Sequence, residues 1–565
     1  MYLCFDMYRK ILATIPTPFR RRGWVLALNI VLRAMLNFFG VALLVPLLVL
    51  LLDQEALLAD ARFSAVYQFL GCESYREFVL YVVGAIVLAV VAKNLANLAL
   101  YRYERDFIYE LYKSISRRLY IGYFGRGYAF VKQNNSIELS RRVNLVSLSF
   151  VVGVLRPMAT IVGEAILLLL IVVAMALYNV VAVGCAILIL IPTSWAYYRF
   201  IRRRMSQYGR EENEAHKMRF RSVTESFRGY ADVEVNNAFD RMLRDFDSQT
   251  QSLVNMQRRN AMLSMIPSHI MEVAVVGGMS LLVLVGLYYS MVDVKILFGV
   301  FAIAIMRLMP SLRSLLSAYM AINQNSYTLD VIAEADEVCQ TKPTEQRLNL
   351  KSHLELRNLS FSYRDENVIQ DLTLKINSGD KIGIQGVSGR GKSTLINLLL
   401  GLLEPTSGKI LIDGVELNAA NRRMWQNSVG YVPQNLFLLD ASLKENIAFG
   451  VEPEKIDMQR LQRAITMASL EGVVESLPDG LESNVGEGGC RLSGGERQRI
   501  GIARALYRQP DVLFLDEATS ALDLETEQQI THSIKQLSEH NPDLTIVIVA
   551  HRSSSLECCD YTINL

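Results

Sequence analysis

The residues whose chemistry is clearest form a glycine-rich run at positions 386–394. Its pattern of Gly, four residues, Gly, Lys and Ser lets successive backbone N–H groups surround phosphate oxygens. The lysine adds positive charge for the outer phosphates, and the hydroxyl after it can ligate Mg²⁺. A short apolar stretch at 381–385 predicts a strand before the run, and 395–402 predicts a helix after it, whose N-terminus favours an anion. The residues expected to hold the phosphates are Gly386, Ser388, Gly389, Arg390, Gly391, Lys392, Ser393 and Thr394.

A second group of chemical residues ends the apolar run at 512–517, which predicts a buried strand followed by two carboxylates. Such a strand can place Asp516 beside a Mg²⁺ ion held at Ser393, and Glu517 near an attacking water. The ordinary alternative is that these carboxylates form the polar end of a strand. The phosphate-binding pattern upstream favours the catalytic interpretation.

The chain has 565 residues, 51% of them hydrophobic, so more than one core is expected. Up to about residue 325 it contains repeated apolar runs, each reaching the ~20 residues needed to cross ~30 Å of hydrocarbon. They predict a membrane α-helical bundle with six transmembrane helices, at about 24–52, 78–100, 157–177, 180–200, 270–289 and 296–319. The net charge of +2 gives no indication of a nucleic-acid partner.

Basic residues are concentrated before the first run, between runs two and three, and between runs four and five. The positive-inside rule therefore places both termini and the two long loops in the cytoplasm of a multi-pass protein of the cell (inner) membrane. Helical periodicity in these loops predicts long cytoplasmic extensions of the helices. We expect a membrane domain at 1–335, a polar linker at 336–353 and a soluble α/β domain at 354–565.

The seven cysteines are scattered, and their spacing predicts neither a disulfide framework nor a zinc site. Only Cys558 and Cys559 are adjacent. Two interpretations of this pair stay open: a redox-active pair, or two small buried residues, which is the more ordinary case.

The run Leu492-Ser493-Gly494-Gly495-Glu496 matches the signature of ABC ATPases. With this motif the chain resembles an ABC transporter half-molecule of the exporter type over nearly its whole length. The resemblance implies a cytoplasmic α/β P-loop ABC ATPase domain fused to the membrane bundle, with ATP and Mg²⁺ as ligands. It also assigns adenine stacking to Tyr363, a Mg²⁺ contact to Gln434, the D-loop aspartate to Asp523 and a γ-phosphate contact to His551.

The resemblance further implies a dimer. In this family the signature residues Ser493, Gly494, Gly495 and Glu496 cap the γ-phosphate of ATP that is held by the other subunit. One chain therefore carries half of each site, and because every site motif is present here, a homodimer would have two competent sites.

The substrate must be inferred from the membrane half, where buried charges are costly and are functional candidates. If Arg33, Arg307 and Arg313 line a common cavity, they would suit an anionic, phosphate-bearing head group. The alternative is that these arginines lie on cytoplasmic extensions or reach the interface. The long external loop at 53–77 and the stretch 307–312 resemble those of flippases for lipid-linked oligosaccharides.

Three functions follow from these observations. The first is ATP-driven flipping of an amphipathic, lipid-linked oligosaccharide or related glycolipid. The second is export of drugs, peptides or other lipids. The third is a non-transporting ABC ATPase, which the apolar runs fused to the ATPase domain disfavour.

Overall fold

The computed structural model describes residues 17–47, 67, 74–178, 180–288, 294–334, 344–363, 366–387, 389–517, 524–550 and 556–565. The chain divides into two compact units. The first comprises Met1–Arg126 and Phe130–Cys339, and the second comprises Gly127–Ala129 and Gln340–Leu565. The main division thus falls between Cys339 and Gln340, inside the stretch expected to be a linker.

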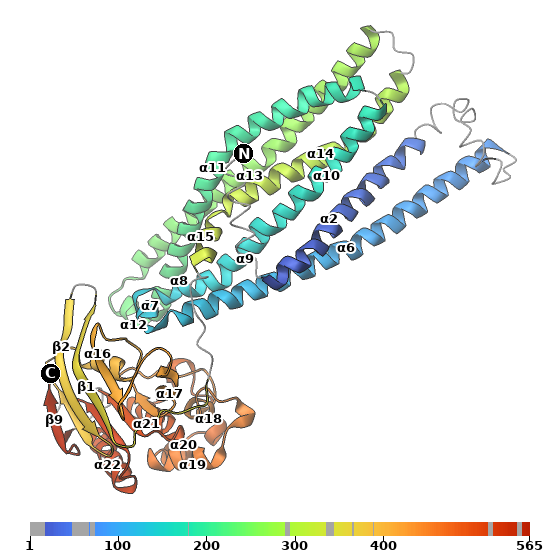
Figure 1. Cartoon of the computed structure of the whole chain (residues 1–565). Coiled ribbons are helices and arrows are strands. Elements are labelled where there is room, and N and C mark those ends of the chain that lie inside the picture. The colour runs from blue at the N-terminus through green and yellow to red at the C-terminus, as the bar shows by residue number, and fades with distance from the viewer. Residues whose placement is uncertain are drawn as a thin grey trace. The chain divides into compact units, whose positions relative to one another are not determined.

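Long helices build the first unit (Figure 1). Three of them have 49 to 51 residues, which at 1.5 Å per residue is about 75 Å and far exceeds a bilayer's hydrocarbon layer. They therefore extend well beyond any membrane they cross. The long helices are α2 (Thr17–Ala42), α6 (Tyr75–Gly125), α10 (Arg156–Tyr178), α11 (Val180–Arg228), α13 (Phe239–Tyr288) and α14 (Val294–Gln324).

Shorter helical segments connect these helices. Two of them, η1 and η2, are π-helical turns, in which the backbone bonds i to i+5. The segments are α7 (Gly127–Gln133), α8 (Ser136–Arg141), η1 (Arg142–Val146), α9 (Ser147–Phe150), η2 (Val151–Leu155), α12 (Tyr230–Val235) and α15 (Tyr327–Ala333).

In the first unit α2 packs on α6 and α10, α10 also packs on α14, and α11 packs on α13. Many large apolar side chains point away from these contacts; Leu88 and Leu98, for example, are 71% and 66% exposed. Within the described residues, four segments are long and apolar enough to cross a membrane: Pro18–Leu47, Tyr75–Gly125, Ser136–Leu177 and Phe239–Leu281. The predicted spans at 180–200 and 296–319 lie in α11 and α14 and stay predictions.

The second unit contains two sheets. One has the antiparallel order β2-β1-β4-β5, and the other has the parallel order β6-β7-β8-β3-β9. The strands are β1 (His353–Tyr363), β2 (Glu366–Asn377), β3 (Lys381–Gln385), β4 (Ser407–Ile412), β5 (Val415–Glu416), β6 (Val429–Val432), β7 (Val512–Asp516), β8 (Thr545–Val549) and β9 (Tyr561–Asn564).

The second unit also contains helices, of which α16, α17 and α21 contact the parallel sheet. The helices are α16 (Lys392–Leu399), α17 (Arg422–Gln426), α18 (Leu443–Ile447), α19 (Met458–Met467), α20 (Glu471–Ser476), α21 (Gly494–Tyr507) and α22 (Leu524–His540), with short 3₁₀ turns η4 (Pro453–Lys455), η5 (Gly480–Glu482) and η6 (Glu487–Gly489).

The parallel sheet positions the chemistry. All residues of β7 and β8 are buried, as expected for continuous apolar strands covered on both faces. Strands β3 and β7 lie on either side of β8. Because parallel strands end at the same edge of the sheet, the loop after β3 and the carboxylates at the end of β7 come together there.

Candidate nucleotide site and membrane charges

The glycine-rich loop ends in the left-handed backbone that its glycines permit. Gly389 has φ 85° and Gly391 has φ 91°. Gly391 is the N-cap of α16 and makes no side-chain cap bond. A Cβ at Gly391 would lie 2.9 Å from Cγ1 of Val368, so the site accepts no larger residue there. The N-terminus of α16 is therefore left available for an anion.

Lys392 lies inside this loop with only 4% of its surface exposed. Its Nζ donates to the carbonyl oxygens of Gly386 at 2.8 Å and Val387 at 3.3 Å. A buried ammonium needs such partners. The charge is thus held where the loop would surround outer phosphate groups.

At the end of β7, the Ser393 Oγ lies 3.5 Å from Oδ1 of Asp516. Burial first, and the neighbouring Glu517 charge second, raise the pKa of Asp516, while hydrogen bonds from Ser393 and Tyr431 oppose that rise. A hydroxyl and a carboxylate oxygen are ligands that Mg²⁺ prefers, and a cation there would favour the ionised carboxylate. The donor set fits Mg²⁺. Sequence reasoning missed Tyr431, whose place in the pattern of β6 gave no signal.

Glu517 occupies a strained backbone position, with φ 50°. Its N–H donates to the carbonyl oxygen of Val549 at 2.9 Å, which ties it to β8. Gln434 Nε2 donates to Glu517 Oε2 at 2.6 Å. A left-handed non-glycine residue costs on the order of 1–3 kcal/mol and is often found at functional sites. The structure therefore brings two predicted catalytic residues into direct contact.

The signature run begins helix α21. Ser493 is its N-cap, with the Oγ accepting from the Glu496 N–H at 3.3 Å, and Glu496 Oε2 accepting from the Ser493 N–H at 2.7 Å. This is a capping box. Gly494 and Gly495 are the first residues of the helix. Helix α21 packs on β6, α18 and α19, which fixes its direction within the unit.

The remaining predicted residues are placed as follows. Tyr363 ends β1, is 38% exposed, and meets Phe361 edge-on with ring centroids 4.8 Å apart. Thr394 lies in the first turn of α16, and the Arg390 N–H donates to the Val387 carbonyl at 3.3 Å. Ser388, Asp523 and His551 lie outside the described residues.

In the first unit, Arg33 of α2 forms an ion pair with Glu104 of α6, and its guanidinium lies 4.8 Å from the Tyr101 ring centroid. The Glu104 side chain is only 7% exposed. A cavity of about 100 Å³ opens beside this pair and is also lined by Arg156 and Glu164 of α10. The cavity combines two arginines with two glutamates rather than presenting positive charge alone.

Arg313 lines a different cavity, of about 480 Å³, with Met309, Pro310 and Ser268. The two cavities share no lining residue, and Arg307 lines neither of them. The predicted head-group site required one cavity lined by all three arginines. These two pockets of the single chain do not form such a cavity.

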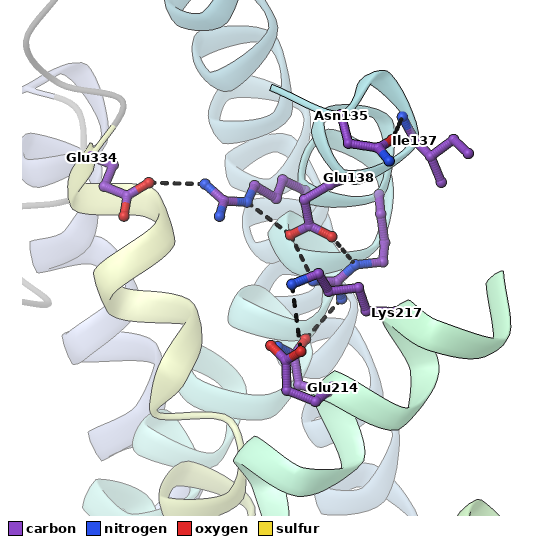
Figure 2. Close-up of polar contacts among 9 residues, drawn as sticks. Asn135, Ile137, Glu138, Glu214, Lys217 and Glu334 are labelled. Atoms are coloured by element: carbon purple, nitrogen blue, oxygen red, sulfur yellow. Dashed lines mark hydrogen bonds and ion pairs between the residues drawn. The ribbon is translucent and has the colours of Figure 1, made fainter. Parts of the chain in front are cut away.

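A polar cluster between α8 and the end of α15 was not predicted from the sequence (Figure 2). Glu138 accepts hydrogen bonds from Arg141 at 2.9 and 3.0 Å and from Arg142 at 2.9 Å. Arg142 also donates to Glu334 at 2.9 Å, and Arg141 donates to Asn213 of α11 at 2.7 Å. The cluster thus ties the π-helical segment to the residue directly before 335–343, where the first unit ends.

Comparison with solved structures shows the fold. A chain described as "Structure of a bacterial Atm1-family ABC exporter with ATP bound" superposes with a TM-score of 0.77 at 22% identity, covering 97% of this chain and 94% of that one. The protein therefore has the fold of an ABC exporter, a helical membrane region followed by an ABC ATPase domain.

Sequence comparison gives the family. The model described as "ABC transporter" matches residues 369–520. The ATP-dependent lipid A-core flippase of Bordetella avium is 30% identical over 426 residues, or 74% of this chain and 71% of that protein. The chain belongs to the ABC transporter family and is an exporter-type half-transporter with several membrane-crossing helices, as the signature predicted.

Other relatives match over shorter stretches. A Bacillus subtilis protein, provisionally named multidrug export ATP-binding/permease protein YgaD, is 36% identical over 260 residues, 45% of this chain and 44% of that protein. An ATP-dependent lipid A-core flippase of Cupriavidus metallidurans is 40% identical over 206 residues, 36% of this chain and 34% of that protein. The chain thus spans less than half the length of each of these two relatives.

Proposed function

We propose that this protein is a homodimeric, ATP-driven translocase that moves an amphipathic lipid, a lipid-linked oligosaccharide or related glycolipid, from the cytoplasmic to the outer leaflet. It would lie in the inner membrane with both termini in the cytoplasm. The observation that carries the proposal is the contact of Gln434 with Glu517 beside the Ser393–Asp516 pair, on a chain whose other half consists of long apolar helices.

The ATPase chemistry follows from these side chains. Lys392 and the first-turn N–H groups of α16 would hold the outer phosphates. Ser393, Asp516 and Gln434 would hold Mg²⁺, which would neutralise phosphate charge. Glu517 accepts a proton from the attacking water, and its contact with Gln434 orients the carboxylate. We expect His551 to contact the γ-phosphate and Tyr363 to stack on adenine.

The homodimer is proposed from the signature helix. Ser493, Gly494 and Gly495 form a helix N-terminus that suits an anion. In an exporter-type dimer this terminus would close over the phosphates bound at the partner's Lys392. Two identical chains would then form two composite sites.

A mixing experiment tests the composite site. Lys392→Ala and Ser493→Ala chains are each expected to hydrolyse ATP poorly alone. When they are co-assembled, one site carries both changes and the other carries neither, so about half of the normal activity per mixed dimer should return. If the mixture stays as inactive as its parents, the composite site is wrong.

The glycolipid substrate is supported by the flippase name of the Bordetella avium relative. The multidrug name of the Bacillus subtilis relative favours a second candidate, export of drugs or other lipids.

Reconstitution separates the two candidates. In proteoliposomes, ATP hydrolysis should rise with a lipid-linked oligosaccharide or an acidic glycolipid and stay near its basal rate with hydrophobic drugs. Glu517→Gln protein gives the background rate. Stimulation by drugs alone would overturn the glycolipid proposal in favour of the second candidate.

A further inference from the structure

The turn between β8 and β9 carries the two adjacent cysteines, a feature that the ATPase chemistry does not use. The Cys559 N–H donates to the Leu556 carbonyl at 3.0 Å, which closes a tight turn over residues 556–559. Both cysteines are reduced and partly buried, and both pack against the apolar core of the second unit.

The two sulfur atoms are neighbours in space as well as in sequence. The Cys559 thiol donates a hydrogen bond to the Cys558 sulfur. This bond is the main cause that lowers the pKa of Cys558, and the charges of Lys381 and Lys535 add to it. The same bond, with burial, raises the pKa of Cys559. Because Cys558 also lines the adjoining cavity, we expect this thiol to react first.

Space for a reagent exists beside this pair. A cavity of about 300 Å³ is lined by Cys558 and by residues of α22, among them Thr531, His532 and Lys535. A buried pair with no adjoining cavity would be inert. Here a small aromatic molecule can approach Cys558 without opening the core.

We propose that Cys558 and Cys559 form a dithiol site for trivalent organoarsenic compounds, whose occupation inhibits the ATPase. In the reaction two S–H bonds break and two S–As bonds form. The two protons leave with the oxygen of the arsenical as one water molecule. No group is oxidised or reduced, so no further reactant is required.

Inhibition follows from where the turn is anchored. The Asp560 N–H donates to the Lys381 carbonyl at 2.7 Å, and the Lys381 N–H donates to Asp560 Oδ2 at 2.9 Å. Leu556 packs on Gly383, where a Cβ would come within 2.9 Å of its Cδ2. Lys381 and Gly383 belong to β3, the strand that leads into the phosphate-binding loop. A bridge between the sulfurs would therefore shift that strand.

The experiment uses the full-length, reduced protein and phenylarsine oxide. Intact mass should show one bridged arsenical per chain, and peptide mapping of the unsubstituted protein should place it on residues 558–559. ATP hydrolysis should fall about tenfold, equivalent to about 1.4 kcal/mol. A dithiol such as dimercaprol should restore it, whereas a monothiol should not.

Substitutions give the controls. Cys490→Ser, which removes an exposed thiol outside this turn, should leave both labelling and inhibition intact. Cys558→Ser and Cys559→Ser should each lose them. Labelling mapped elsewhere, or bridging without inhibition, would overturn the proposal. The inhibition measurement rests on the proposed ATPase function, whereas labelling is measured by mass and does not. A protein without ATPase activity that is still labelled at 558–559 would therefore contradict the proposed function and not the dithiol site.

Discussion

The two helix N-termini expected to meet phosphate are built in opposite ways. Helix α16 begins after Gly391 in a left-handed conformation, with no side-chain cap. Helix α21 begins at Ser493, and the box that Ser493 forms with Glu496 satisfies the N–H groups of these two residues. The loop before α16 leaves its N–H donors available for nucleotide bound by the same subunit. Helix α21 is stabilised by its own cap, and its N-terminus is proposed to face nucleotide bound by the partner subunit.

The largest expected effect is on the α16 side of this comparison. Glu517→Gln should keep ATP binding but lower turnover by about 10²–10⁴-fold, because the amide cannot accept the proton from water. Phosphate release and equilibrium ATP binding measure the two quantities. Glu496→Gln is the matched change at α21. It should lower turnover far less, since glutamine also closes a capping box. Equal losses would remove the distinction between the two termini.

Gly391→Ala should destabilise the loop by about 1–3 kcal/mol, because alanine is strained at φ 91° and its Cβ would clash with Val368. ATP affinity should fall with it. Gly450→Ala is the control, since Gly450 has φ 87° but nothing within 4 Å of its added Cβ. Thermal unfolding with and without ATP compares the two variants. If only Gly450→Ala lost the stabilisation that ATP gives, the assignment of Gly391 to the nucleotide site would be contradicted.

Ser493→Ala and Ser442→Ala sharpen the comparison on the α21 side. Both serines form capping boxes, Ser442 with Glu445 at the start of α18. Each change should cost about 1 kcal/mol of stability. Only Ser493→Ala should also slow ATP hydrolysis, because only that helix end is proposed to meet nucleotide. Denaturant unfolding and steady-state hydrolysis separate the two effects, and a similar slowing by both variants would leave Ser493 with a structural role alone.

The smallest expected effect is a pH dependence at Asp516. Its pKa is raised, so its protonated form favours the native state, and that stabilisation is lost as pH rises through the folded pKa. Mg²⁺ needs the ionised form, so the Mg²⁺ concentration for half-maximal hydrolysis should increase as the pH is lowered toward that pKa. A Mg²⁺ requirement that stays constant over the whole acid range in which the protein remains folded would contradict this role.

The sequence predicted the chemical groups of the ATPase domain because their spacing is local. Loop, strand and helix follow one another within a few residues at 381–402 and at 512–517, so the order of types was sufficient to predict their structure. Sequence reasoning could not find the Tyr431 bond to Asp516 or the bond from Arg142 to Glu334, because both join residues far apart in the chain.

The membrane charges show the same limit. The sequence predicted that Arg33, Arg307 and Arg313 lie within membrane spans, but their partners depend on which helices are neighbours. The packing of α2 on α6 pairs Arg33 with Glu104 and separates it from the cavity of Arg313. Charge alone therefore predicted an anion site, whereas packing produced a cavity of mixed charge.

The amino-acid order by itself determined that the chain has an apolar helical half and a phosphate-binding half, because each hydrophobic run and the glycine spacing are patterns within one continuous stretch of chain. Only the tertiary structure decided that Gln434 contacts Glu517, that the turn carrying the two thiols is bonded to the strand before the phosphate loop, and that Arg33 pairs with Glu104. These contacts depend on which elements lie side by side, and that is fixed by burial of the whole core.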